Sequence, residues 1–430
     1  MKDRTKFLLL LLAFCLSYLL PFEHPRLKEA ILSAFLLLQD YARNHVLLCL
    51  VPALFIAGAI SAFLTQEAIL RYLGPAANKV LAYSVASVSG AILAVCSCTV
   101  LPLFAGIYRM GAGIGPASAF LYSGPAINVL AIVLTAKVLG WQIGLARAVC
   151  AIGFSYAIGS LMALFFKGEG SKKGFSPALT KAGEGLSLLK EALFMASLIG
   201  VLVFVNWPKP KSEGGLWFYL WRAKWFISSG FALLLAFFFV KWLGAKQWLV
   251  LLGIGLTLLL SFIFPDHPAV PFSVAVAFLT LTSLYSSPQT RYWVDSTWFY
   301  AKTILPLLFG GVMVSGFLLG LPGEDSGIIP SFWVAKLVGG NSWYANLLAS
   351  VIGAFMYFAT LTEVPIVQGL IGAGMGKGPA LALLLAGPAL SLPSMLVIRQ
   401  VMGTKKAAVF ILLVIIFSTV AGTIFGQISS

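Results

Sequence analysis

Residues 96–128 read CSCTVLPLFAGIYRMGAGIGPASAFLYSGPAIN, and this stretch decides the fold. It is apolar enough to lie in a membrane, yet glycine and proline interrupt it every few residues. Backbone groups in hydrocarbon must be satisfied internally, so interrupted segments occur only where protein or a water-lined cavity surrounds them. In transporters such segments form the substrate site near the middle of the bilayer. The stretch therefore predicts a transport path, with helix breaks at Pro102, Gly124 and Pro125.

The same pattern of glycine and proline returns 263 positions later without a gap. The first-half positions are Thr99, Pro102, Gly106, Gly111, Gly113, Gly115, Pro116, Gly124 and Pro125, and their counterparts are Thr362, Pro365, Gly369, Gly374, Gly376, Gly378, Pro379, Gly387 and Pro388. Paired interrupted segments in corresponding halves are the best sequence indicator of a transport site. The match predicts two pseudo-symmetric repeats and further helix breaks at Pro365, Gly387 and Pro388.

The composition places the chain in a membrane. Hydrophobic residues make up 60% and charged residues 10%, and the mean hydropathy is +0.97. Soluble domains average about 25% charged residues. We therefore predict an all-α polytopic protein with about 10 transmembrane segments, in the plasma membrane. The net charge of +15 comes from residues at segment ends and in loops, which suits anionic headgroups and indicates no nucleic-acid partner.

Hydropathy and linker composition predict five parts of the chain. These are an N-terminal span (7–22) and an interfacial helix within residues 1–45, a first repeat at 46–167, a basic linker at 168–187, middle helices at 188–298, and a second repeat at 299–430. The first span lacks a small-residue cleavage site and reads as an uncleaved helix. The middle spans are expected at 188–206, 225–241, 247–264 and 268–287, with an interfacial loop containing Trp217 and Trp221.

The relative orientation of the two repeats depends on how the broken segments are counted. Counting each as one crossing gives parallel repeats, and counting each as two gives inverted ones. Because half-helices at the midplane accompany inverted repeats, we favour the inverted arrangement, with broken or re-entrant half-helices.

The pair Cys96-x-Cys98 is the most specific chemical feature. Two thiols that flank one residue in an extended segment face the same side. Thiolates are soft ligands that suit Cu(I), Zn or another thiophilic species, such as trivalent arsenic. Packing as small apolar residues is the alternative, and it is the preferred interpretation for Cys15, Cys49 and Cys150. The second half has Ala359 and Leu361 at the matching positions, so the pair belongs to one repeat.

Glu363 is the second feature, because a carboxylate at membrane depth is costly and is functional by default. It precedes the second half-helix, where the first half has Val100. Burial favours the neutral acid and a helix N-terminus favours the carboxylate, which suits a reversible proton carrier. Two structural interpretations compete: Glu363 caps the helix, or it pairs with a basic residue such as Arg399.

Four polar residues lie at the predicted breaks and could line the path. They are Thr99, Asn128, Thr362 and Ser391. Each could instead satisfy backbone groups freed by the break. The three histidines have no partners at metal-ligand spacing, and the glycine-rich turns precede no Walker lysine, so no cofactor is predicted.

The first half of the chain carries the motifs Cys-Ser-Cys-Thr-x-x-Pro, Gly-Pro-Ala and Ser-Gly-Pro-Ala-Ile-Asn, and the second half carries Thr362-Glu-Val-Pro and Gly387-Pro-Ala-Leu-Ser391. These motifs resemble those of the predicted permeases of the ArsP type. The resemblance covers both halves. It implies a membrane permease, with efflux of trivalent organoarsenicals or arsenite in characterised members.

The residues and the resemblance lead to one main hypothesis. The chain is expected to be a permease rather than an enzyme, a proton-coupled secondary transporter that expels a thiophilic solute bound at Cys96 and Cys98. The alternatives are a permease for another small solute, such as a sulfur compound or metal ion, and a membrane thiol–disulfide electron relay. A relay through both halves would need cysteines in each, and the second half has none.

Overall fold

The computed structural model of the chain describes residues 24–63, 73–74, 77–93, 97–167, 188–207, 209, 215–321, 324–330, 336–356, 363–372 and 374–429. Within these ranges the regular structure is helical, and extended pairing is limited to isolated bridges from Gly339 and Gly340 to Met375. The helices are α2 Pro25–Tyr41, the π-helix η1 Ala42–Leu50, α3 Val51–Phe63, α5 Lys79–Leu93, α6 Ser97–Arg109, α7 Ile114–Ala126, α8 Val129–Val138, α9 Trp141–Phe165, α10 Leu188–Val205, α11 Leu216–Leu243, α12 Gln247–Ile263, α13 Ala269–Tyr285, α14 Pro288–Leu319, α16 Trp343–Phe355, α17 Glu363–Gly372, α18 Lys377–Ala386, α19 Leu392–Met402 and α20 Thr404–Ile428.

Five of the described helices are long and apolar enough to cross a membrane. They are Pro25–Phe63, Trp141–Phe165, Trp217–Leu243, Pro288–Leu319 and Thr404–Ile428. A sixth crossing results if α7 and α8, which meet at a bend of 43°, form one span. Since a span needs about 20 residues, these helices define an integral membrane protein, as the composition predicts.

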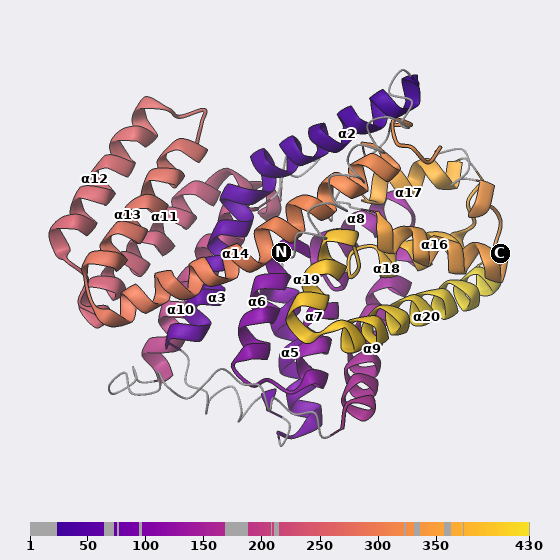
Figure 1. Cartoon of the computed structure of the whole chain (residues 1–430), viewed down its shortest axis with the longest axis horizontal. Coiled ribbons are helices and arrows are strands. Elements are labelled where there is room, and N and C mark those ends of the chain that lie inside the picture. Colours follow the sequence, from indigo (N-terminus) through magenta and orange to yellow (C-terminus); the bar gives the residue numbers. More distant parts are fainter. Residues whose placement is uncertain are drawn as a thin grey trace, which may run out of the picture.

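Helix α14 organises the packing of the molecule. It crosses the view of Figure 1 diagonally, from the group formed by α11, α12 and α13 toward the group formed by α16 to α20. Along its length it packs against α13, α3, α2 and α19. Trp293, fully buried, donates from Nε1 to the carbonyl of Phe55 at 2.7 Å and so joins α14 to α3. The helices α5, α6, α7 and α9 occupy the lower part of the same view.

The helix boundaries of the two halves recur at the spacing of the sequence match. Shifted by 263 residues, α5 to α9 coincide with α16 to α20 to within three residues at every end, and α9 and α20 coincide at both ends. The contacts recur as well, because α6 packs against α19 while α8 packs against α17. Phe154 of α9 lies 5.0 Å, between ring centroids, from Phe417 of α20, its own counterpart. A pseudo-two-fold axis that passed between these two rings would bring counterparts into contact in this way.

The same close helix approach occurs in both halves. A Cβ on Gly115 would lie 2.9 Å from the carbonyl oxygen of Gly159, and a Cβ on Gly378 would lie 2.5 Å from that of Gly422. These glycines bring α7 onto α9 and α18 onto α20. Small residues that let backbones approach closely are typical of membrane helix pairs.

We expect Gly378→Ala to destabilise the protein by about 1–3 kcal/mol, since the added methyl group meets backbone that cannot swing away. Gly153→Ala in α9 is the matched control, because a Cβ there meets no atom within 4 Å. Thermal unfolding of the two variants in detergent measures the difference. Equal transition temperatures would contradict the role given to the close approach.

Several predicted spans agree with the described helices, and some boundaries differ. The middle spans correspond to α10, α11, α12 and α13. The predicted interfacial loop is wrong in part, because Trp217 and Trp221 lie in the first turns of α11. The interfacial helix predicted within residues 1–45 is not separate from the start of the predicted first repeat, because α2, η1 and α3 form one helix of 39 residues. Helix α14 also runs through the predicted boundary at residue 298, while the span at 7–22 and the linker at 168–187 lie outside the described residues.

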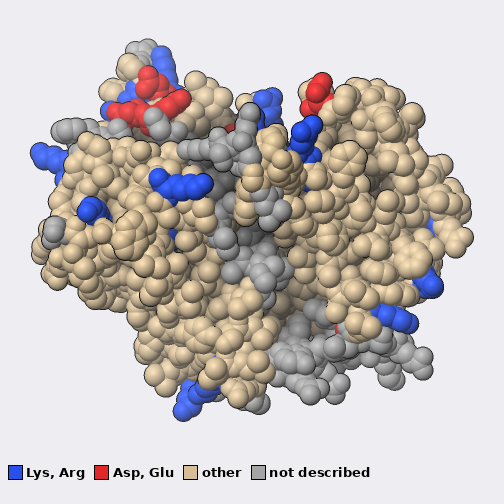
Figure 2. Space-filling view, turned by 180° about the vertical axis from the view of Figure 1, so that it is seen from behind, with Lys and Arg blue, Asp and Glu red and all other residues tan. Residues whose placement is uncertain are grey.

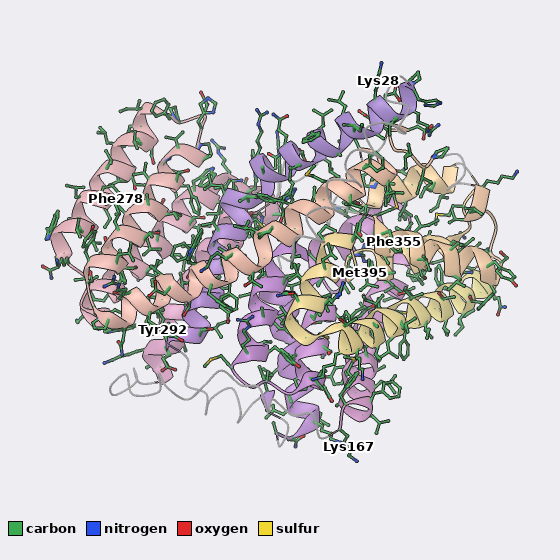
Figure 3. All side chains as sticks on the ribbon, in the orientation of Figure 1. Lys28, Lys167, Phe278, Tyr292, Phe355 and Met395 are labelled. Carbon is green, nitrogen blue, oxygen red and sulfur yellow. The ribbon has the colours of Figure 1, made fainter. Side chains whose placement is uncertain are left out.

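The surface suits a lipid environment. On the face drawn in Figure 2, few charged side chains interrupt a broad uncharged surface, and most of the acidic atoms visible there lie at one edge. Phe226 and Phe262 are each 84% exposed. Lys28 near the start of α2 and Lys167 after α9 lie at opposite edges of the molecule (Figure 3). A broad apolar surface of this kind is typical of a face that contacts lipid or another protein.

Candidate functional site

The structure describes part of the predicted site. Cys96 and Thr362 lie outside the described residues, and for Cys98 it describes the backbone alone, in the first turn of α6. Thr99, in the same turn, is fully buried. The convergence of the two sulfurs therefore stays a prediction.

The predicted break residues lie in or next to short helices. Pro102 is inside α6, which continues to Arg109 as a helix of 13 residues, about 20 Å long. Gly124 and Pro125 are inside α7, and the break itself follows at Ile127 and Asn128 rather than at the glycine–proline pair.

In the second half the break residues lie closer to the helix ends. Pro365 is in the first turn of α17. The backbone N–H groups of a first turn have no acceptor within the helix, so a proline there costs no helical hydrogen bond. Gly387 is the C-terminal cap of α18, and Pro388 follows it in the connection to α19. Helices of this length cross only part of a bilayer.

Asn128 and Ser391, which are counterparts, begin the helices that follow the breaks. The Asn128 side-chain oxygen accepts from the backbone N–H of Ala131 at 3.4 Å, and the Ser391 hydroxyl accepts from that of Ser394 at 3.3 Å. Both side chains are buried. Both residues therefore cap the N-terminus of the helix that follows them.

We expect Asn128→Ala and Ser391→Ala each to lower stability by about 1 kcal/mol, because each leaves a helix-start N–H without its acceptor. Ser261→Ala is a suitable control, since this exposed serine lies inside α12 and donates to the carbonyl of Thr257. Thermal unfolding of the purified proteins gives the comparison. Unchanged stability of both cap variants would show that the caps contribute nothing.

Glu363 is the first residue of α17 and is 1% exposed. Its Oε1 accepts a hydrogen bond from Nη2 of Arg147 at 2.5 Å, forming an ion pair in which the arginine is fully buried. Nη1 of Arg147 donates to the hydroxyl of Thr135 at 3.0 Å. That hydroxyl in turn donates to the carbonyl of Ala131 at 2.6 Å. The network joins α8 and α9 of the first half to α17 of the second.

The partner of Glu363 is Arg147 and not Arg399. Arg399 is exposed near the end of α19 and donates to the hydroxyl of Thr404 at 3.2 Å. Arg147 was not among the site residues predicted from the sequence. One signal was available, because Arg147 lies within a 25-residue apolar helix that carries no other charge, and an intramembrane cation calls for a partner.

The ion pair is incompletely satisfied. Nε of Arg147 and Oε2 of Glu363 are buried and have no hydrogen-bond partner among the described residues, and the same holds for the hydroxyl of Tyr122. Removing one member of a buried pair leaves an uncompensated charge and destabilises a protein by about 3–5 kcal/mol, whereas an apolar replacement of both is often neutral. Stability alone therefore does not explain a buried ion pair at this place in the fold.

The pair breaks the symmetry between the halves. The counterpart of Glu363 is Val100 and the counterpart of Arg147 is Phe410, and both are buried. The same frame thus accommodates apolar residues at both positions. The charged pair is therefore confined to one of the two equivalent places, as Cys96 and Cys98 are in the sequence.

The other described thiols and histidines form no comparable site. Cys49 is buried and Cys150 is half-buried. Within the described ranges no three His, Cys, Asp or Glu side chains come together to hold a metal ion. His45 stacks on the ring of Tyr41 at 5.8 Å between centroids.

Interrupted helices around a buried ion pair define a polytopic membrane protein of the transporter class. The chain belongs to the ArsP_1 family, described as a predicted permease, which matches residues 31–427. It is 40% identical over 390 residues to the UPF0718 protein MJ0584 of Methanocaldococcus jannaschii, covering 90% of this chain and 94% of that protein. A stretch of 65 residues, 15% of the chain, is 43% identical to the UPF0718 protein YraQ of Escherichia coli, covering 19% of it. No solved structure matches the chain.

Proposed function

We propose that this permease is a proton-coupled secondary transporter that expels a thiophilic small solute such as a trivalent organoarsenical. The observation that carries the proposal is Glu363, a carboxylate 1% exposed at the start of the short helix α17, paired across the two halves with Arg147. A carboxylate in this position can bind and release a proton inside the membrane. In the plasma membrane, the proton gradient would then drive the solute out.

The proposed solute follows from the donor atoms. Cys96 and Cys98 flank the start of α6, and an arsenical with one carbon substituent leaves two bonds for two sulfurs. Thr99 and Thr362 would line the path beside them, together with Asn128 and Ser391, whose side chains also cap helices. No nucleotide-binding loop occurs in the sequence, which favours coupling to an ion gradient.

The proposed architecture is a pair of inverted repeats with about 10 crossings. The coincident helix boundaries and the contact between Phe154 and Phe417 support a two-fold relation. The short helices α6 and α17 support half-crossings, which accompany inverted repeats. In such a frame, rocking of one half against the other around the shared site gives alternating access.

Transport by everted membrane vesicles tests the function. Vesicles that contain the wild-type protein are acidified inside and offered trivalent monomethylarsenic, arsenite or Cd²⁺. We expect accumulation of the monomethyl arsenical that a protonophore abolishes. Accumulation of Cd²⁺ alone would favour the metal-ion permease, and the absence of any pH-driven accumulation would contradict proton-coupled efflux of these solutes.

A further inference from the structure

Among the described residues, the helices around the ion pair hold one acid. Helices α8 and α18 pack against α17, and helices α5, α7, α8, α18 and α20 pack against α9. In these elements and in α9 and α17, as the structure describes them, Glu363 is the sole acidic side chain. The basic side chains on the packed elements lie at helix ends: Lys79, Lys137, Lys377, Lys405 and Lys406. Lys377 donates to the carbonyl of Ser429 and Lys406 to the hydroxyl of Tyr108, so neither faces Glu363.

Protonation of Glu363 therefore leaves Arg147 without a counter-ion among the residues that the structure describes. Tyr122 on α7 and Thr135 on α8 carry hydroxyl groups and not carboxylates, so they do not replace the lost anion. A fully buried guanidinium without an anion is strongly disfavoured. The protonated protein must then favour an arrangement in which Arg147 reaches water or another anion.

Helix α17 is the element that this change can move. It has 10 residues, of which Glu363, Val364 and Val367 are buried. Its sequence counterpart α6 and the following helix α18 are packed far more completely, since nine of the 10 residues of α18 are buried. A Cβ on Gly369 or Gly372 would meet no atom within 4 Å. With so little packing, the ion pair is a principal attachment of α17 to the first half.

We infer that Arg147 converts protonation of Glu363 into release of α17. The pair is closed while the carboxylate is ionised, and it opens when the carboxyl group takes a proton. Arg147 is thus a positioning residue. It does not carry the proton, but through it the position of α17 depends on the protonation state of Glu363. The inference rests on the proposed function insofar as Glu363 is the group that takes the proton.

Cysteine alkylation at neighbouring positions of α17 tests the inference without any solute. Val367 is fully buried one turn after Glu363, whereas Gln368 is exposed. Val367→Cys and Gln368→Cys are made separately in a protein whose five native cysteines are replaced by serine or alanine. The ratio of their maleimide reaction rates cancels the pH dependence of the reagent. With the pair intact, we expect the reaction rate of Val367→Cys divided by that of Gln368→Cys to rise about tenfold when the pH falls from about 8 to about 5.

The paired neutral variant Arg147→Gln with Glu363→Gln should show no pH dependence of this ratio. Arg147→Phe with Glu363→Val is the second neutral variant, since Phe410 and Val100 occupy the equivalent positions; it serves if the glutamine pair fails to fold. A rise in the ratio of equal size in a neutral variant would overturn the inference. So would a ratio independent of pH in the protein with the intact pair.

The alkylation test and the transport test can each reject one hypothesis without rejecting the other. A pH-dependent ratio in a protein that shows no proton-driven transport would leave the Arg147 switch standing and reject the proposed function. Proton-driven transport with a constant ratio would reject the switch and leave the function standing. Arg147→Lys, which keeps the charge, should keep the pH dependence of the ratio.

Discussion

Replacing Glu363 by glutamine is expected to stop transport driven by a pH gradient while solute binding survives. Glutamine keeps the shape of the side chain and much of its hydrogen bonding, but it cannot exchange a proton with water. Because the glutamine leaves Arg147 buried without an anion, the variant should also lose about 3–5 kcal/mol of stability. A cap with no coupling role would lose about 1 kcal/mol and keep transport.

Uptake by everted vesicles and thermal unfolding in detergent measure the two effects. Glu191→Gln is the matched control, because Glu191 is a buried acid in α10 that lies in no ion pair within the described residues. Addition of Arg147→Gln to the Glu363 variant should restore most of the stability without restoring proton-driven uptake. Uptake near the wild-type rate by Glu363→Gln, with its pH dependence unchanged, would rule out the carrier role.

The periodic features of the chain could be predicted from the sequence. The middle helices α10 to α13 follow from hydropathy, since each is an apolar run bounded by polar or proline-containing loops. The spacing of 263 residues follows from glycine and proline, which fix backbone geometry and so mark the same helix ends in both halves. Glu363 stood out because it is an acid in an apolar segment.

The ion pair could not be predicted, for a physical reason. Glu363 and Arg147 are 216 residues apart, and their contact depends on how the two halves pack. Sequence spacing shows which side chains share a helix face, not which helices meet. The internal repeat does not reveal the pair either, because the counterparts Val100 and Phe410 are apolar.

The continuous helix from Pro25 to Phe63 was also missed. The charged residues Lys28, Glu29, Asp40 and Arg43 around an apolar centre suggested an interfacial helix that leads into a separate span. In the structure, the π-helix η1 joins the two segments, so Pro52 lies within one continuous helix. Hydropathy alone does not distinguish a helix that leaves the membrane from one that continues along another helix, as α2 does along α14.

Replacing Cys96 or Cys98 by serine is expected to abolish resistance to trivalent monomethylarsenic at an unchanged level of protein. Residues two apart point to opposite sides of a helix and to the same side of an extended segment. Because Cys98 lies in the first turn of α6, the two sulfurs converge only if Cys96 stands in extended backbone before the helix. A serine hydroxyl is a hard donor and cannot replace the lost sulfur.

Growth of a sensitive strain that expresses each variant measures the resistance, and immunoblotting of membranes measures the protein. Cys150→Ser is the matched control, since this half-buried thiol lies in α9 and is expected to contribute packing alone. If both sulfurs bind the solute, each single variant should be as sensitive as a strain without the protein, because one thiolate does not complete the two-sulfur site. Resistance that persists in either single variant would reject a paired-thiolate site and leave a permease for a solute of another kind.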